Sequence, residues 1–175
     1  MKKKLITPPV LTAVTRDELK AWGVVEHTDD DTLIDGLILS ATDMFERYTG
    51  RYVMEQVWQF AYECWPPNEL IVDGAYNVIS IESLSYRQTN GIVFGLSTEA
   101  VILADYYIDK IGEPFRIKPI VSWPSINTDQ FNNVFVNLKM GYESADDVPD
   151  AIKTAIKLIA AELYRNREAS APVKL

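Results

Sequence analysis

Few residues in this chain could do chemistry, and they stand apart from one another. His27 is the only histidine and Cys64 the only cysteine. A histidine-based metal cluster needs several imidazoles, and no serine or cysteine motif surrounds His27 to make it the base of a nucleophilic enzyme. We therefore expect His27 to occupy a loop or cap position. Cys64 has no partner for a disulfide, and we expect it to be a small buried apolar side chain.

Two groups of acids could in principle bind a cation or transfer protons, Asp29–Asp31 and Asp146–Asp147. The first group lacks the alternating spacing and the distal glutamate of a calcium loop. Both groups precede an apolar, helically periodic segment, where carboxylates favour the positive end of the helix dipole. Neither a Walker phosphate loop nor a G-x-G-x-x-G is present. The sequence therefore predicts no catalytic, cofactor-binding or metal-binding residue, no cofactor and no enzymatic activity.

An amphipathic helix is predicted from Asp31 to Arg51. Its apolar residues recur at i, i+3, i+4, i+7, i+11 and i+14 and share one stripe: Ile34, Leu37, Ile38, Ala41, Phe45 and Tyr48. Asp29 to Asp31 supply N-cap candidates, and Thr49 with Gly50 is typical of a helix end. Leu39 lies about 140° from the centre of the stripe, among acidic residues, and is expected to be exposed.

A second amphipathic helix is predicted from Val148 to Glu168, with Pro149 in its first turn. Its stripe consists of Ile152, Ala155, Ile156, Ile159, Ala160 and Leu163. Leu158 and Tyr164 lie on opposite flanks of that stripe, so the apolar arc is wider than one small core requires. Either deep burial or a second contact surface explains the width.

The segment between these helices reads as strands. Trp58, Phe60, Tyr62 and Cys64 alternate with other residues, which indicates a strand with one buried face. Further strands or apolar runs are expected at 70–72, 78–86, 101–103, 106–108, 115–117 and 134–140, with a hairpin turn at Asn90-Gly91 and a long loop at 122–133. No helix separates them, so we expect antiparallel pairing.

The predicted fold class is therefore α+β, in which N-terminal helices and a long C-terminal helix pack together and the central region is mostly antiparallel β. A short first helix opens at the capping box Thr15/Glu18 and runs through Trp22. We divide the chain into an extended arm (1–14), a single α+β domain (15–168) and a flexible tail (169–175). Within the domain, 15–50 and 148–168 are helical and 52–142 is β-rich.

Composition narrows the function further. A chain of 175 residues fits one domain. The net charge of −8 argues against sequence-independent nucleic-acid binding, which needs a basic surface. Lys2–Lys4 are followed at once by Thr7, Pro8 and Pro9 rather than by an apolar run, and no run reaches the length of a membrane helix. We expect a protein made and kept in the cytoplasm, or released from it by lysis.

Aromatic residues are numerous, with four tryptophans, nine tyrosines and six phenylalanines. Trp65-Pro66 and Trp123-Pro124 each place a large ring beside a proline at the edge of a strand or loop. These rings either close the ends of the core of a small sheet or form an interface, where tryptophan is enriched.

Short motifs occur along nearly the whole chain in a fixed order. They are T-P-P (Thr7, Pro8, Pro9), T-x-x-E-L-K (Thr15, Glu18, Leu19, Lys20), D-D-x-L-I-x-x-L-I-x-x-A (Asp30, Asp31, Leu33, Ile34, Leu37, Ile38, Ala41), E-R-Y-T-G-R (Glu46 to Arg51), W-P (Trp65, Pro66), G-Y (Gly141, Tyr142), V-P-x-x-I-K-x-A-I (Val148, Pro149, Ile152, Lys153, Ala155, Ile156) and Y-x-N-R-E (Tyr164, Asn166, Arg167, Glu168). Their order and spacing resemble those of the head-to-tail connector, or adaptor, proteins of tailed phages and prophages.

The resemblance implies a structural virion protein without catalytic activity, assembled in the host cytoplasm. Such adaptors form a ring, typically twelve-fold, beneath the portal and provide the platform for a stopper or tail-completion protein. Double-stranded DNA passes through the ring without sequence-specific binding, and no membrane is involved. The protein could still be a monomer in isolation.

The resemblance also suggests residue roles. The C-terminal helix and tail of adaptors usually engage the portal, which assigns portal contact to Tyr164, Arg165, Arg167 and the residues from Ala169 to Leu175, including Val173 and Leu175. The exposed Leu39 and the flanking Leu158 are hypothetical contacts between subunits of the ring. If so, Leu39→Asp is expected to weaken ring assembly without lowering the melting temperature of the monomer.

A function from another class fits the same composition. A cytoplasmic binding module could hold a small ligand in an aromatic-lined pocket of the β region, around Trp58, Phe60 and Tyr62. A ring former and a ligand module are distinguished by mass and by stabilisation with a metabolite.

Overall fold

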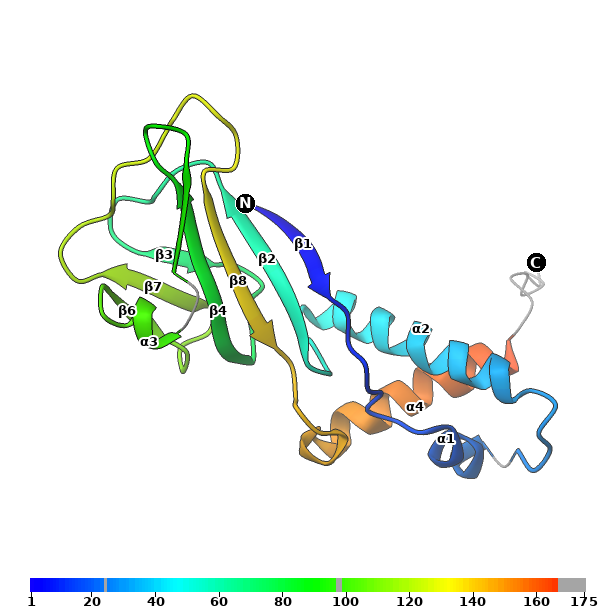
Figure 1. The fold of residues 1–175 in the computed structure, drawn as a ribbon. Helices are drawn as coiled ribbons and strands as arrows, with labels where there is room; N and C mark the ends of the chain where they lie inside the picture. The colour runs from blue at the N-terminus through cyan, green and yellow to red at the C-terminus, as the bar shows by residue number, and fades with distance from the viewer. Residues whose placement is uncertain (24, 97–98, 167–175) are drawn as a thin grey trace, which may run out of the picture.

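The protein has a helical part and a β part, which lie on opposite sides of Figure 1. The computed structural model describes residues 1–23, 25–96 and 99–166. The helical part contains α1 (Arg16–Gly23), α2 (Asp31–Thr49) and α4 (Asp150–Arg165), and a short 3-10 helix (Ala145–Asp147) precedes α4. Helix α2 runs antiparallel to α4, and α1 packs against both.

The β part consists of two antiparallel sheets. The larger sheet has the strand order β1-β2-β8-β4-β5 and the smaller has the order β3-β7-β6. The strands of the larger sheet are β1 (Lys2–Thr7), β2 (Gln56–Tyr62), β4 (Val78–Arg87), β5 (Val93–Leu96) and β8 (Val134–Met140). Those of the smaller sheet are β3 (Leu70–Val72), β6 (Tyr106–Asp109) and β7 (Phe115–Pro119), with the short helix α3 (Glu99–Ile102) preceding β6. The predicted α+β class is confirmed.

One hydrophobic core fills the space between the two sheets. Central strand β8 alternates strictly, with Val134, Val136, Leu138 and Met140 completely buried, as expected for a strand with one face on a core. Residues from both sheets join this core, as do the two tryptophans that precede prolines. Trp65 and Trp123 stack at 4.4 Å between ring centroids. The interpretation that these rings close a core is therefore confirmed.

A second core lies among the three helices of the helical part. Ile34, Ile38 and Ala41 of α2 are buried together with Ile156 and Ala160 of α4. The ends of the helices are formed by the predicted signals. The amide of Thr15 donates to the Glu18 carboxylate at 2.7 Å, and the amide of Glu18 donates to Thr15 Oγ1 at 3.2 Å. Gly50 closes α2 in the left-handed region, at φ 72°.

Three sequence-based interpretations were wrong. Tyr48, assigned to the buried stripe of α2, is 93% exposed, because the part of that stripe that packs on the helical core ends at Phe45. Cys64 is exposed rather than buried, because β2 ends at Tyr62 and the chain bends there. The third error is the expectation that no helix interrupts the strands, since α3 occupies most of the run predicted at 101–103. Asp30 does occupy the N-cap position of α2, but its side chain makes no cap hydrogen bond. Asp31 instead forms ion pairs with side chains of α1.

The chain passes three times between the two parts. The first passage follows β1, which pairs along the edge of the larger sheet with β2, and continues to Ala13 and Val14, both buried in the helical core. The other two passages lie side by side, since Met54 forms a bridge with Tyr142. The helical and β parts are therefore tied together by backbone hydrogen bonds as well as by packing.

Candidate protein-binding surfaces

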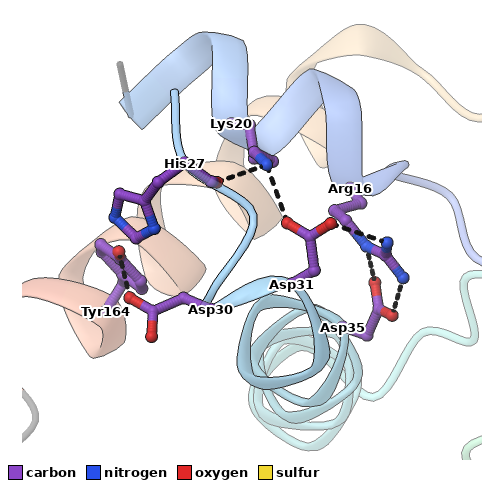
Figure 2. Close-up of polar contacts among 7 residues, drawn as sticks. All are labelled: Arg16, Lys20, His27, Asp30, Asp31, Asp35 and Tyr164. Atoms are coloured by element: carbon purple, nitrogen blue, oxygen red, sulfur yellow. Dashed lines mark hydrogen bonds and ion pairs between the residues drawn. The ribbon is translucent and has the colours of Figure 1, made fainter. Parts of the chain in front are cut away.

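A network of ion pairs fixes α1 onto the start of α2 (Figure 2). The Arg16 guanidinium donates to both carboxylate oxygens of Asp35 and, at 3.1 Å, to Asp31. Lys20 Nζ donates to Asp31 Oδ1 at 2.7 Å and to the backbone oxygen of His27 at 2.7 Å. These contacts join two helices that also share the helical core, to which α1 contributes Leu19 and α2 contributes Ile34.

The network lowers the pKa values of its carboxyl groups. The hydrogen bond from Lys20 is the largest cause for Asp31, and the hydrogen bond from Arg16 is the largest cause for Asp35. The same hydrogen bond to Asp35 raises the pKa of Arg16. Both acids are therefore ionised at neutral pH and attract the two basic residues of α1.

The end of α4 is attached to the same region. The Tyr164 hydroxyl donates to Asp30 Oδ2 at 2.7 Å, across 134 residues of sequence. Figure 2 shows this pair beside the His27 loop. His27 lies in that loop, between α1 and α2, as predicted. The last turn of α4 is thus held against the start of α2.

Acidification is expected to loosen this network. The folded-state pKa values of Asp31 and Asp35 lie below the ordinary carboxyl value, so their stabilisation is complete above about pH 4 and is lost as the pH falls through the folded values. The fluorescence of Trp22, compared between the wild type and a Trp22→Phe variant, will report the release of α1. An Asp31→Asn/Asp35→Asn variant should show a smaller change as the pH falls below about 4. An equal acid response in that variant would contradict the assignment.

Two of the residues predicted to contact a portal lie at this end of α4. Tyr164 is half-buried through its bond to Asp30, whereas Arg165 is exposed. Both line a small hollow of about 90 Å³ together with apolar residues of α1, α2 and the loop between them. Arg167, Val173 and Leu175 lie outside the described residues.

The two predicted subunit contacts are both exposed but do not come together. Leu39 is 58% exposed and Leu158 is 55% exposed. Leu39 points away from α4, about 130° from the centre of the buried stripe Ile34/Ile38/Ala41. Leu158 lies on the side of α4 opposite Ile156. They therefore belong to separate surfaces.

Sequence reasoning missed another exposed apolar group on α2. Leu33, Met44 and Tyr48 are 41%, 50% and 93% exposed. With the half-buried Leu37 they recur at i, i+4, i+11 and i+15, which places them on one stripe of the helix. The helical period of the sequence also fits this stripe, but Leu37 and Tyr48 fit equally well in the adjacent stripe that is predicted to be buried.

The aromatic residues considered for a ligand pocket do not line one together. Phe60 is completely buried in the β core, and the Tyr62 hydroxyl donates to the backbone of Ile71 at 3.1 Å. Trp58 packs on Tyr52, 5.2 Å between ring centroids, beneath the Lys3 ammonium. The three side chains are used in separate packing contacts.

A groove of about 340 Å³ does lie at the junction of α2 with β1 and β2. Its polar groups are already paired. Glu46, whose pKa is raised by burial, accepts from the amide of Val53 at 2.7 Å and from Gln56 at 2.9 Å. Arg47 pairs with Asp43 at 2.8 Å. The groove therefore presents no set of free polar groups converging on a ligand.

The described residues offer neither a membrane span nor a metal site. Among them, no helix is long and apolar enough to cross a membrane. Within the same part of the chain, no three His, Cys, Asp or Glu side chains are placed to share a metal ion.

The arrangement of two β sheets on a three-helix unit matches solved chains from gene transfer agent (GTA) particles. A chain in the neck of an empty GTA particle, with C6 symmetry, superimposes with a TM-score of 0.80 and 16% identity, covering 100% of this chain and 89% of that one. A chain in the virion of the native gene transfer agent (GTA) particle gives a TM-score of 0.80 at 17% identity, covering 99% and 89%. A third, in the neck of the native particle with C12 symmetry, gives 0.69 at 18% identity, covering 97% and 87%.

No family model and no curated protein matches the sequence. At identities below 20%, the structural matches establish the fold and not the partners. The resemblance to head-to-tail connectors, first seen in short motifs, is confirmed at the level of the fold, since the similar chains belong to the neck region of a particle.

Proposed function

We propose that this chain is a structural head-to-tail connector that forms a ring beneath a portal and carries a stopper or tail. The observation that carries the proposal is the match over the full length of the chain to a protein in the neck of a GTA particle. The match includes both the helical and the β parts, so it does not rest on a common helical motif alone. Activity as an enzyme forms no part of the proposal.

The symmetry of the similar structures supports a ring of copies of this chain. Those necks carry C6 and C12 symmetry. Rotational symmetry of this kind arises when one interface, repeated head to tail between copies, closes into a ring. A twelve-fold ring in the virion is the proposed assembly. The net charge of −8 suits a surface past which DNA moves without binding.

The end of α4 is the proposed contact with the portal. Tyr164 anchors the last turn through Asp30, and the adjacent Arg165 is exposed and can pair with an acidic partner. The sequence continues through Arg167 to Val173 and Leu175, which are proposed to share this contact. A segment presented by every subunit of a ring would bind by avidity, so a weak contact for each copy suffices.

A truncated variant tests the portal contact. A chain ending at Arg165 retains every buried residue of α4, so it is expected to keep its melting temperature within a few degrees and to lose capture by portal rings in a pull-down. The control is Ile111→Asp, a change at a 97% exposed residue of the β part, which should be captured normally. Undiminished capture of the truncated chain would overturn the assignment.

The alternative of a small-ligand module is not favoured. The rings around Trp58, Phe60 and Tyr62 do not converge, and the polar groups of the groove at α2 are already paired. A ligand module also gives no reason for a second apolar stripe on α2.

A further inference from the structure

Among the residues that the structure describes, α1 covers one side of the pair α2 and α4. On α2, Asp31 and Asp35 face α1 through their ion pairs. At 100° per residue they lie about 75° to one side of the buried stripe Ile34/Ile38/Ala41. The exposed stripe Leu33/Leu37/Met44/Tyr48 lies about 80° to the other side. This stripe therefore borders the face of the helix pair that α1 leaves open.

Helix α4 is apolar on the same open face. Its side toward α1 carries Lys157, which lies over the ring of Trp22 at 5.3 Å, and Ala161. The opposite flank carries the half-buried Ile152, Ile159 and Leu163. The apolar stripe predicted for this helix is thus divided between two surfaces, whereas the flanking Leu158 belongs to neither. One part of the stripe packs on α1 and α2, and the rest continues the open face, which we define as Leu33, Leu37, Met44, Tyr48, Ile159 and Leu163.

A different part of the molecule carries a complementary feature. The arm between β1 and α1 exposes Val10 (91%) and Leu11 (56%). These residues border a hollow of about 190 Å³ whose walls also include Pro8, Met54 and Val57. Figure 1 shows this arm descending from β1 to α1, the helix that covers the other side of the α2–α4 pair. The molecule thus has a protruding apolar face and a recessed site whose apolar walls are bordered by Glu55 and Glu143, formed by different elements.

We propose that the open face of one copy packs against the arm hollow of the next, with Tyr48 inserted beside Val10 and Leu11. A ring requires such a heterologous contact between two different patches, whereas a self-complementary patch would stop at a dimer. A tyrosine buried at an interface removes about 150–250 Å² from water, a substantial part of the roughly 800 Å² that each partner of a stable interface buries. The inference rests on the proposed ring and specifies its contact.

Substitutions separate this contact from the fold. Tyr48→Asp is expected to shift the concentration for ring assembly at least tenfold, or about 1.4 kcal/mol, because aromatic residues at the centre of an interface contribute much of its binding energy. Its melting temperature should not change, since Tyr48 is 93% exposed. Ile111→Asp, at a 97% exposed residue of the β part, should assemble normally. Unaltered assembly of Tyr48→Asp would overturn the proposal.

Cross-linking identifies the partner surface. The native exposed Cys64 is first replaced by serine. The double variant Tyr48→Cys/Val10→Cys, treated with a short bismaleimide at high protein concentration, should give a ladder of covalent multimers. Each single variant should give none. A dimer from Tyr48→Cys alone would reveal a symmetric contact and overturn the head-to-tail arrangement.

The mass of protein that has not been cross-linked tests the ring separately from the contact between Tyr48 and the arm. If large rings form but the double variant gives no ladder, the ring stands and this contact is wrong. If no species larger than the monomer forms at any concentration or with portal rings, the proposed function fails, and the contact fails with it.

Discussion

Gly141→Ala is expected to destabilise the protein by about 3 kcal/mol or more. Gly141 has φ +107°, outside the regions open to other residues, and a Cβ there would lie 2.3 Å from the backbone oxygen of Met54. The strained backbone and the overlap each cost about 1–3 kcal/mol. The obstacle is backbone and cannot rotate away as a side chain could.

Gly141 lies where the helical part joins the β part, so the substitution is expected to affect both parts. Next to Gly141, Tyr142 donates to the backbone of Val53 at 2.9 Å and accepts from Glu55 at 2.9 Å. Separation of these strands would uncouple the helical part from the β part. Gly141 therefore permits the close approach of the two chain passages that connect the halves of the molecule.

A second glycine with positive φ is the matched control. Gly74 has φ +76°, but a Cβ there meets nothing within 4 Å. Gly74→Ala should therefore cost only the conformational term of about 1–2 kcal/mol. Urea unfolding of both variants measures the difference directly. Equal losses at the two sites would show that the contact with Met54 is relieved by a small shift of the backbone.

Local signals predicted the helical part well. The period of 3.6 residues identified α2 and α4, the capping box Thr15/Glu18 began α1, and Gly50 ended α2. Each of these signals depends on residues within one or two turns of the chain. Alternation likewise identified β8, because its buried and half-buried residues follow the period of the strand.

Contacts between distant segments could not be predicted in the same way. The pairing of β1 with β2 joins Lys2 to Ala61, and the bond between Tyr164 and Asp30 spans the chain. Nothing in the sequence shows that Asp31, the first residue of α2, meets Arg16 and Lys20 rather than capping its own helix. A carboxylate is stabilised either by the N-terminus of a helix or by a basic side chain, and the position of α1 decides which of these contacts forms.

The exposed apolar surfaces could be predicted only in part from the sequence, for the same reason. Periodicity correctly predicted that Leu39 is exposed. It could not tell which flank of a wide apolar arc faces a neighbouring helix, since that depends on where α1 packs. Tyr48 was therefore placed in the core although it protrudes, and the open face became visible only once α1 was positioned.

Ile156→Ala is expected to lower the free energy of unfolding by about 2–5 kcal/mol. Ile156 of α4 is completely buried in the helical core, and loss of its side-chain carbons would leave a cavity there. The helical core is small, so a loss of this size is a large part of the stability of an ordinary domain. Thermal unfolding followed by circular dichroism measures the effect.

Leu158→Ala, on the same helix, is the control that separates packing from assembly. Leu158 is 55% exposed, so its truncation should change stability by no more than about 0.5 kcal/mol. If Leu158 also contacts a neighbouring subunit, Leu158→Asp should impair ring assembly while the monomer melts normally. A similar destabilisation by both alanine variants would mean that Leu158 is buried in the protein as it exists in solution. The second contact surface predicted from the wide arc of α4 would then be ordinary core packing, and the contact proposed between Tyr48 and the arm hollow would be unaffected.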